Sequence, residues 1–252
     1  MRALHFYVVI IGSEILNGRR IDKHFSYIRD MLLLRGHVLY ASFTIKDDSQ
    51  LIQNVFELIK NDPQSVLFSF GGIGSTPDDL TRQIASDVFS DGTLYPHPRF
   101  MNDILERFGD QAYPHRIFMS HLPKNADLLH NVINNMSGFY LNERYFFMPG
   151  FPEMSHPMVN EALDRFYPQG IREFRYTLLA QTGENTLIEQ MKALEPSIDF
   201  SSLPMINGGS PQVEISVASR DERLAQESFK IFTDFLQKEN IVFDILQNGS
   251  KR

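Results

Sequence analysis

Hydrophobic and polar positions alternate along the first half of the chain in blocks that predict strands and helices in turn. An unbroken apolar run with β-branched residues covers 4–11, as expected for a strand buried on both faces. Further strands are predicted over 37–45 and 66–70. Between them, apolar residues recur at the spacing of amphipathic helices. This order predicts an α/β fold with a doubly wound, mainly parallel sheet.

Polar residues at the boundaries of these blocks fit helix ends. Asp22 can cap the first predicted helix, and Gly36 lies where a C-terminal glycine cap belongs. Either Asp47 or Asp48 can cap the second helix, and the sequence leaves this choice open. The third helix is predicted over 79–89.

The second half of the chain predicts the end of this domain and then a smaller one. Residues 168–170, Pro-Gln-Gly, are typical of a linker, so domains are predicted over 1–168 and 171–247. The elements expected before the linker are a helix over about 99–108, a strand over 145–148 and a helix ending near 166. The elements expected after it, a small α+β module with a ferredoxin-like order, are strands over 173–180, 213–218 and 241–245 and helices over 186–194 and 221–238.

The composition indicates a globular protein without a basic surface. Of 252 residues, 42% are hydrophobic, which allows a sizeable core, and the net charge is −7. Because no cluster of Lys and Arg occurs, nucleic acid is not expected as a partner. The absence of cysteine excludes disulfides, zinc–cysteine sites and thiol catalysis. No apolar stretch approaches the roughly 20 residues of a membrane helix, so we expect a cytoplasmic protein with no membrane partner.

The third predicted strand leads into SFGGIGSTPDDLT, residues 69–81, where candidate chemistry is concentrated. Three glycines in four positions allow positive φ angles and close approach of a ligand. A helix starting near Asp79, with Thr76 or Asp78 as its cap, would direct free N–H groups at an anion. Carboxylates beside a phosphate are explained by a hard cation such as Mg²⁺ that bridges the two.

The same segment also has a purely structural explanation, because Gly-rich turns and Asp caps are common in α/β proteins that bind nothing there. It is not a P-loop, since no Gly-Lys-Ser/Thr follows, and GGIGST does not match the dinucleotide pattern GxGxxG. The eight histidines show no ligand spacing and are expected to be structural or surface residues. Against the structural explanation, the polar residues Gly12-Ser13-Glu14 and Asp47-Asp48 follow the first two strands, and parallel sheets bind ligands at that edge.

Four segments in the same order resemble the molybdopterin-binding (MoaB/Mog-like) family, in its CinA amino-terminal branch, which is related to a domain of some FAD synthases. They are IGSEILNGRRIDKH (11–24), IKDD (45–48), GGIGSTPDDLT (71–81) and LPKNADLLHNVINNMSGFYLNERYFFMPGFPEM (122–154). The resemblance covers about residues 4–166 and implies a three-layer α/β/α domain. Four positions depart from the family pattern, namely His24 for Asn, Ser75 for Pro, Val132 for Pro and Phe151 for Val.

The resemblance implies a ligand with a phosphate or pyrophosphate next to a ring system, together with a divalent metal (Mg²⁺, Mn²⁺ or Co²⁺). Asp47 and Asp79 occupy the family's two acidic positions and would hold the metal; with Glu14 they are the expected catalytic residues. The residues expected to bind the ligand are Gly71, Gly72, Gly74 and Ser75 through their N–H groups, Thr76 through its hydroxyl, and Asp78, Gly12, Asp22 and Gly150 from the matching segments.

Two functions remain open on these grounds. The first is hydrolysis of the pyrophosphate bond of a nucleotide-diphosphate compound of the ADP-ribose or FAD class, with Glu14 or Asp78 orienting water. The second is a molybdopterin-binding protein of molybdenum cofactor biosynthesis without hydrolytic activity. A small-molecule nucleotide or pterin is the expected partner in both, and the family resemblance implies a homo-oligomer, dimer or trimer.

Overall fold

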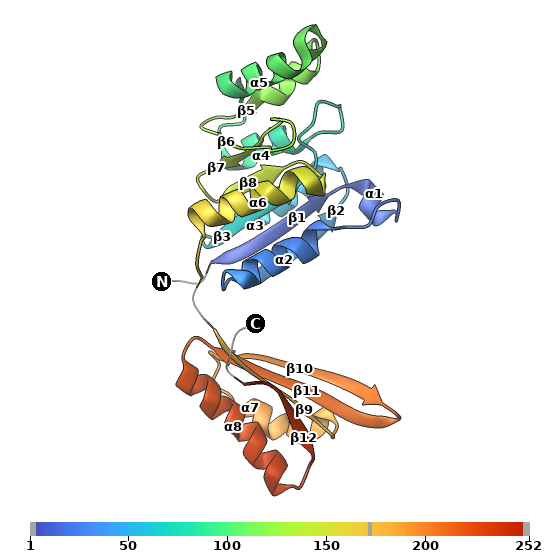
Figure 1. Ribbon diagram of the computed structural model, residues 1–252, viewed down its shortest axis with the longest axis vertical. Coiled ribbons are helices and arrows are strands. Elements are labelled where there is room, and N and C mark those ends of the chain that lie inside the picture. Colours follow the sequence, from blue (N-terminus) through green and yellow to red (C-terminus); the bar gives the residue numbers. More distant parts are fainter. Residues whose placement is uncertain (1–3, 171–172, 249–252) are drawn as a thin grey trace. The chain divides into compact units, whose positions relative to one another are not determined.

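The computed structural model describes residues 4–170 and 173–248, and the chain divides into two compact units, residues 1–170 and 171–252 (Figure 1). Residue 171, the predicted start of the smaller module, lies outside the described residues. Each unit has its own sheet and its own hydrophobic core.

The sheet of the first unit has the strand order β2-β1-β3-β8-β7-β6 among the described residues. Its strands are β1 (His5–Ile11), β2 (Leu39–Ile45), β3 (Ser65–Phe70), β6 (Asp127–Leu129), β7 (Gly138–Leu141) and β8 (Tyr145–Met148). The first four in this order pair in parallel, whereas β7 and β6 are antiparallel. The predicted α/β fold with a mainly parallel sheet is confirmed.

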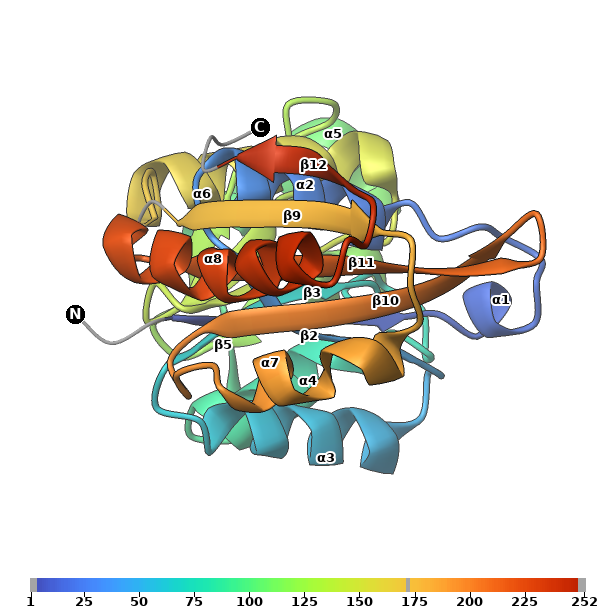
Figure 2. The ribbon, with the colours of Figure 1, turned by 90° about the horizontal axis from the view of Figure 1, so that it is seen from below.

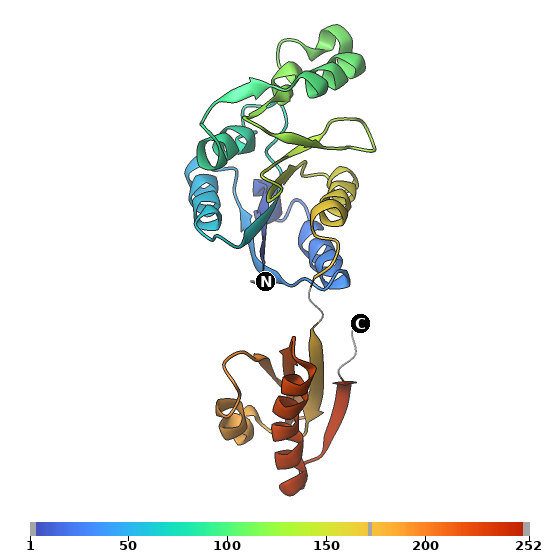
Figure 3. The same cartoon turned by 90° about the vertical axis from the view of Figure 1, so that its left-hand side faces the viewer.

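Helices cover both faces of this sheet (Figure 3). They are α2 (His24–Leu34) and α6 (Pro152–Phe166) on one face, and α3 (Ser49–Lys60) and α4 (Thr81–Phe89) on the other. Successive side chains of a strand point to opposite faces, so alternate apolar residues of β1 enter different cores. Val8 packs with α2 and α6, while Val9 packs with α3 and α4.

A single turn, α1 (Ser13–Leu16), follows β1, and its Ile15 packs against the core on the α2/α6 side. Further short elements extend the α3/α4 side, where β4 pairs with β5. They are β4 (Leu94–Pro96), α5 (Pro98–Phe108), η1 (Gly109–Ala112), η2 (Arg116–Ser120) and β5 (His121–Pro123). The predicted helix over 99–108 corresponds to α5, and Phe100 and Ile104 anchor it in the core.

One predicted boundary in this unit is wrong, and one strand was not predicted. The helix predicted from residue 79 begins at Thr81, because the chain over 76–80 forms turns in which Asp79 N–H donates to Thr76 O and Leu80 N–H to Asp78 O. Neither Thr76 nor Asp78 caps it. Strand β7 was not predicted, because Asn142 and Glu143, both at positive φ, make its turn to β8 without glycine.

The second unit has an antiparallel sheet of strand order β10-β11-β9-β12, with helices on one side (Figure 2). Its elements are β9 (Phe174–Ala180), η3 (Glu184–Leu187), α7 (Ile188–Lys192), β10 (Asp199–Asn207), β11 (Ser210–Ser219), α8 (Glu222–Lys238) and β12 (Phe243–Asn248). This βαββαβ order is ferredoxin-like, as predicted. Strand β10 was missed because it contains Pro204, which an edge strand tolerates.

No helix within residues 4–170 and 173–248 is long and apolar enough to cross a membrane.

Candidate functional site

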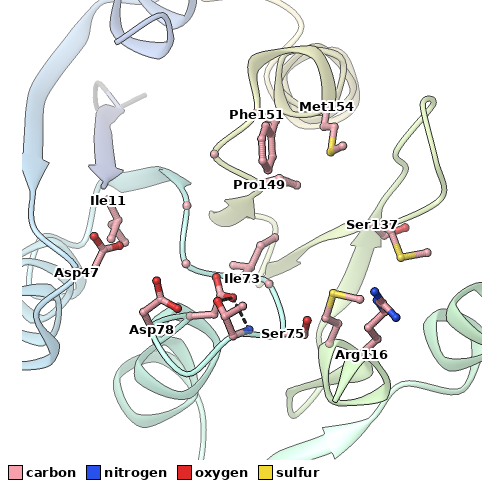
Figure 4. A pocket seen from close by; sticks show the side chains of 18 of the residues that line it. Ile11, Asp47, Ile73, Ser75, Asp78, Arg116, Ser137, Pro149, Phe151 and Met154 are labelled. Atoms are coloured by element: carbon pink, nitrogen blue, oxygen red, sulfur yellow. Dashed lines mark hydrogen bonds between the residues drawn. The ribbon is translucent and has the colours of Figure 1, made fainter. Parts of the chain in front are cut away.

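The carboxyl ends of the four parallel strands meet around a cleft of about 780 Å³ (Figure 4). Asp47 follows β2, the glycine loop follows β3, and Pro149 and Gly150 follow β8. The predicted site residues that line the cleft are Glu14, Asp47, Gly71, Gly72, Gly74, Ser75, Thr76, Asp78, Asp79 and Gly150. The cleft thus brings together residues from four separate strand ends, as the sequence predicted for a parallel sheet.

The glycine loop has a backbone that other residues could not adopt without strain. Gly71 and Gly72 have φ angles of +101° and +68°. A Cβ atom on Gly71 would lie 2.3 Å from Ile11 O, and one on Gly72 would lie 2.3 Å from Thr81 Oγ1. Thr81 fixes this backbone, because its Oγ1 donates to Gly71 O at 3.0 Å and its N–H donates to Gly72 O at 2.9 Å.

Four consecutive backbone N–H groups of the loop, those of residues 72–75, donate to no acceptor in the part of the chain that the structure describes. Backbone N–H groups that point into a concavity at the start of a helix bind anions. The residues on either side are bonded, since Gly71 N–H donates to Met148 O and Thr76 N–H to Asp79. The unbonded groups lie in the wall of the cleft and form the natural place for a phosphate.

The Asp79 carboxylate lies across this loop. Its Oδ2 accepts hydrogen bonds from Thr76 N–H at 2.8 Å and Thr76 Oγ1 at 2.6 Å. A Cβ on Gly74 would come 2.5 Å from the same oxygen, so Gly74 leaves the room in which the carboxylate sits. Asp79 Oδ1 accepts no hydrogen bond from a described residue and is available to a ligand or cation.

The two adjacent acids after β2 have different roles. Asp48 caps α3, because its Oδ1 accepts from Leu51 N–H at 2.8 Å. Asp47 is partly buried in the cleft wall, where its Oδ2 accepts from Ser13 N–H at 2.8 Å and Ser13 Oγ at 2.9 Å. The choice that the sequence left open is therefore decided, with Asp48 as the cap.

This division predicts different outcomes for two neighbouring substitutions. Asp48→Ala should lower the free energy of unfolding by about 1 kcal/mol, as loss of a helix cap does, and leave ligand affinity unchanged. Asp47→Ala should lower the free energy of unfolding by a similar amount, about 1 kcal/mol, because two hydrogen bonds from Ser13 are lost, but it should also lower activity or metal-dependent binding at least about tenfold. Urea unfolding and titration of both variants measure this, and a larger loss of binding in the Asp48 variant would contradict the assignment.

Other predicted residues vary in their relation to the cleft. Glu14 lines it, and the Glu14 carboxylate accepts no hydrogen bond from described residues, although its backbone oxygen accepts one from Arg20 N–H. A Cβ on Gly12 would lie 3.0 Å from Glu14 Oε2. Asp22 is not among the residues that line the cleft, and its carboxylate accepts from His24 N–H at 2.8 Å and Phe25 N–H at 3.1 Å. Asp22 therefore acts as the cap of α2, and Gly12 itself is buried behind the cleft.

Three arginines in the cleft wall were not predicted as site residues. Arg19 and Arg20 come from the segment between α1 and α2, and Arg116 comes from η2 (Figure 4 labels Arg116). Arg20 lies over the ring of Phe151, 5.6 Å from its centroid, and Arg116 over that of Phe108 at 4.7 Å. The adjacent pair at 19–20, directly inside a matching segment, was the signal that could have indicated an anion site.

A second hollow of about 530 Å³ adjoins the cleft. The two share Ile11, Glu14, Arg19, Arg20, Gly150 and Phe151. The far end of the second hollow has Ile15, Phe70 and Pro152 in its wall, and the far end of the cleft has Phe100, Met119 and Met136. Each hollow thus adds apolar surface to the shared charged residues, together with further polar side chains, among them Lys23 and Glu153 in the second hollow and Arg116 in the cleft.

A divalent metal is compatible with the donor set, although no three His, Asp or Glu side chains are grouped as a metal centre within residues 4–170 and 173–248. Asp47 and Asp79 each have one carboxylate oxygen held by hydrogen bonds and the other unbonded. Mg²⁺ is commonly held by one or two carboxylates together with substrate phosphates and water. The two residues fit a metal that binds with its phosphate ligand.

His24, which stands in place of the family's Asn, is buried with 4% of its surface exposed. Its ring stacks on Phe70 at 4.3 Å, and Nε2 lies 3.4 Å from Gly150 O. His156 meets it edge-on at 5.5 Å. Burial lowers the pKa of both imidazoles, and the charge of His24 lowers the pKa of His156 further, while Asp22 and Glu153 act in the opposite direction on both.

This pair predicts that stability falls in mild acid. The folded protein keeps both imidazoles neutral, whereas the unfolded chain binds protons near the ordinary pKa of about 6.5, so stability decreases as pH falls below that value. Melting temperatures between pH 7.5 and 5.5 measure the effect. His24→Asn should reduce this dependence, and His115→Asn, at an exposed position, should leave it unchanged. Equal pH dependence in all three proteins would contradict the explanation.

Comparisons with known proteins agree with this geometry. The family described as probable molybdopterin binding domain matches residues 7–168. A CinA-like protein of Nostoc punctiforme is 25% identical over 232 residues, which cover 87% of this chain and 55% of that protein. A CinA-like protein of Citrifermentans bemidjiense is 31% identical over 163 residues, 62% of this chain and 39% of that protein. The chain spans about half the length of the first of these relatives.

A solved structure supports the same relation. The crystal structure of the protein CinA with unknown function from Thermoplasma acidophilum aligns with a TM-score of 0.56 and 25% identity, covering 65% of this chain and 97% of its own. The resemblance predicted from the sequence motifs is confirmed. Since the family match spans well over half of the chain, the protein belongs to the probable molybdopterin binding domain family.

Proposed function

We propose that the protein hydrolyses the pyrophosphate bond of a nucleotide-diphosphate compound of the ADP-ribose or FAD class with the help of a divalent metal. The observation that carries the proposal is the set of unbonded N–H groups of residues 72–75 in the same cleft as the carboxylates of Asp47 and Asp79. The N–H groups suit a phosphate, and the carboxylates suit a cation that bridges to it.

The two hollows favour a ligand with an organic group at each end. Arg19 and Arg20, which line both hollows, would bind the pyrophosphate in the middle. The apolar ends of the two hollows would take the ring or sugar on each side. Their volumes, about 780 and 530 Å³, lie in the range of small-molecule sites. A lone phosphate or a mononucleotide would leave one of them empty.

The residues of the chain would act mainly by positioning and by charge, as in phosphoryl transfer generally. Asp47 and Asp79 would hold the metal, which supplies positive charge against the pyrophosphate oxygens and acidifies bound water. The loop N–H groups, with Arg19 and Arg20, would hold the phosphates in place. The Glu14 carboxylate, which no described residue bonds, is available to accept a hydrogen bond from the attacking water.

In the reaction, the water oxygen forms a bond to one phosphorus, and the bond from that phosphorus to the bridging oxygen breaks. The bridging oxygen stays on the other phosphate, and the protons of the water pass to solvent. ADP-ribose would give AMP and ribose 5-phosphate. Neither an oxidant nor a second substrate is needed for this balance.

The alternative is a molybdopterin-binding protein without hydrolytic activity. The family membership favours it, since the family is described by that ligand. The sulfur-containing side chains Met119, Met136 and Met154 in the cleft wall also suit a flat, polarisable ring. In this case the phosphate of the pterin would occupy the glycine loop, and the second hollow would have no part in binding.

Turnover assays distinguish the two functions. The purified protein is incubated with ADP-ribose, FAD or NAD⁺, each with Mg²⁺, Mn²⁺ or Co²⁺, and products are separated by chromatography. We expect metal-dependent release of AMP from at least one compound. Absence of turnover with every pair, in protein shown to be folded, would contradict hydrolysis. Bound pterin would then be sought in protein made in a host that produces molybdenum cofactor.

A further inference from the structure

Behind the glycine loop lies a buried arginine that the proposed chemistry has not used. Arg82, the second residue of α4, is 8% exposed. Its Nη1 donates hydrogen bonds to the carbonyl oxygens of Ile73 and Gly74, two consecutive residues of the loop. The side chain therefore reaches back from the helix to the inner surface of the loop.

These bonds decide which way the loop peptides face. A peptide unit directs its carbonyl and its N–H to opposite sides. With the carbonyls of Ile73 and Gly74 turned inward to the guanidinium, the N–H groups of Gly74 and Ser75, which belong to the same two peptides, are turned away from it. They are among the four N–H groups of residues 72–75 that have no described acceptor.

The charge of Arg82 is poorly balanced in the protein alone. No described carboxylate lies within ion-pair distance, and Nε has no described hydrogen-bond partner. Burial lowers the pKa of the guanidinium, with the charge of Asp79 as the opposing influence. Arg82 also lies in the first turn of α4, at the positive end of the helix dipole. The guanidinium charge and the N-terminus of α4 together raise the positive potential beneath the loop.

We propose that Arg82 is the positioning residue of the anion site: it holds the loop with its N–H groups toward the cleft and places a buried positive charge behind the bound phosphate. The inference takes one element from the proposed function, namely that the glycine loop binds a phosphate. Burial of an unpaired cation is costly, so a role in binding explains why an apolar residue does not fill this position. Nη1 carries two N–H groups and so can serve both adjacent carbonyls, while the planar guanidinium keeps this nitrogen in a fixed direction.

The test uses three variants of the whole protein and inorganic pyrophosphate with Mg²⁺ as the probe. Arg82→Met removes charge and hydrogen bonds at similar length, and Arg82→Lys keeps the charge. The matched control is Arg144→Met. Arg144 also donates to backbone carbonyls, those of Ser65 and Asp62, but at the opposite end of β3. Calorimetry gives the affinity, and ¹⁵N relaxation gives backbone order parameters of residues 71–76 without ligand.

We expect Arg82→Met to weaken pyrophosphate binding by about tenfold or more, with Arg82→Lys between it and the unsubstituted protein and Arg144→Met unchanged. Order parameters of the loop should fall from about 0.85 to below about 0.6 in Arg82→Met. Unchanged affinity and unchanged loop order in this variant would overturn the proposal. If Arg82→Met does not fold, Arg82→Lys decides, since fully retained loop order and affinity there would mean that the hydrogen bonds from Nη1 are not required.

The two measurements separate this inference from the proposed function. If the unsubstituted protein binds no pyrophosphate, the proposed function is contradicted, while the loop order parameters still decide whether Arg82 holds the loop. If pyrophosphate binds equally well to all variants, the proposed function stands and the role of Arg82 is wrong.

Discussion

Replacement of Asp79 by alanine is expected to abolish turnover, or to lower kcat/KM by about a hundredfold or more, with little loss of fold. The carboxylate is partly exposed in the cleft, so its removal leaves no buried cavity. The fold loses the two hydrogen bonds from Thr76, which together contribute about 1 kcal/mol to the free energy of unfolding. What the site loses is a metal ligand and the contact that orders the loop.

Two further variants make this prediction specific. Asp79→Asn keeps the shape of the side chain and an acceptor oxygen for Thr76, so it should retain loop order while losing most of the metal-dependent activity. Asp87→Ala changes an exposed acid of the same helix, α4, and should have no effect on activity. If Asp79→Ala instead unfolds the protein, the residue is a structural one and the proposed site is wrong.

The second large effect is expected at Gly71. Gly71→Ala would place a Cβ 2.3 Å from the backbone oxygen of Ile11, in a residue whose φ is +101°. Since this oxygen belongs to the last residue of β1, it cannot move away from the Cβ without disturbing the strand. We expect a loss of about 3 kcal/mol or more in the free energy of unfolding, together with loss of ligand binding. Denaturant unfolding followed by circular dichroism measures it.

Gly18 provides the matched control for this substitution. It also has positive φ, +77°, but a Cβ there would meet no atom within 4 Å. Gly18→Ala should therefore show only the backbone strain, about 1 kcal/mol. Equal effects at the two positions would mean that close packing of the loop against β1 contributes nothing.

Much of the first unit could be predicted because β1 and β3 are buried on both faces and β2 alternates between exposed and half-buried residues. The runs ending at Ile11, Ile45 and Phe70 are continuous in apolar residues or alternate regularly, and nearby glycines and acids mark their ends. Since parallel strands end at one edge, the position of the cleft followed from strand order alone. The short antiparallel strands β4, β5, β6 and β7 needed pairing information that short segments do not carry.

The start of α4 shows why boundaries were harder. Thr76, Asp78 and Asp79 are all good cap residues, so the local sequence favours a helix from about residue 79. In the structure Asp79 bonds back to Thr76 instead, and Thr81 bonds to the loop carbonyls. The competing contacts are tertiary, and sequence spacing cannot rank them.

Two arginines of the site, Arg116 and Arg82, could not be predicted for a similar reason. Arg116 follows a segment without regular pattern, and it reaches the cleft only because α5 and η2 fold over the α4 side of the sheet. From its place in the apolar pattern of the helix, Arg82 would be expected on the exposed face of an amphipathic helix. Its burial depends on the loop that folds over it. Charge count alone, −7 for the chain, pointed away from a local anion site.

The most direct test of the site is a crystal structure of the protein with Mn²⁺ and an ADP-ribose analogue in which a methylene group replaces the bridging oxygen, with anomalous diffraction to locate manganese. The analogue cannot be hydrolysed, so the complex persists. We expect one phosphate against the N–H groups of residues 72–75, and a manganese peak in contact with Asp47, Asp79 and a phosphate oxygen. A nucleotide bound away from the glycine loop, or manganese that contacts neither carboxylate, would contradict the proposed site.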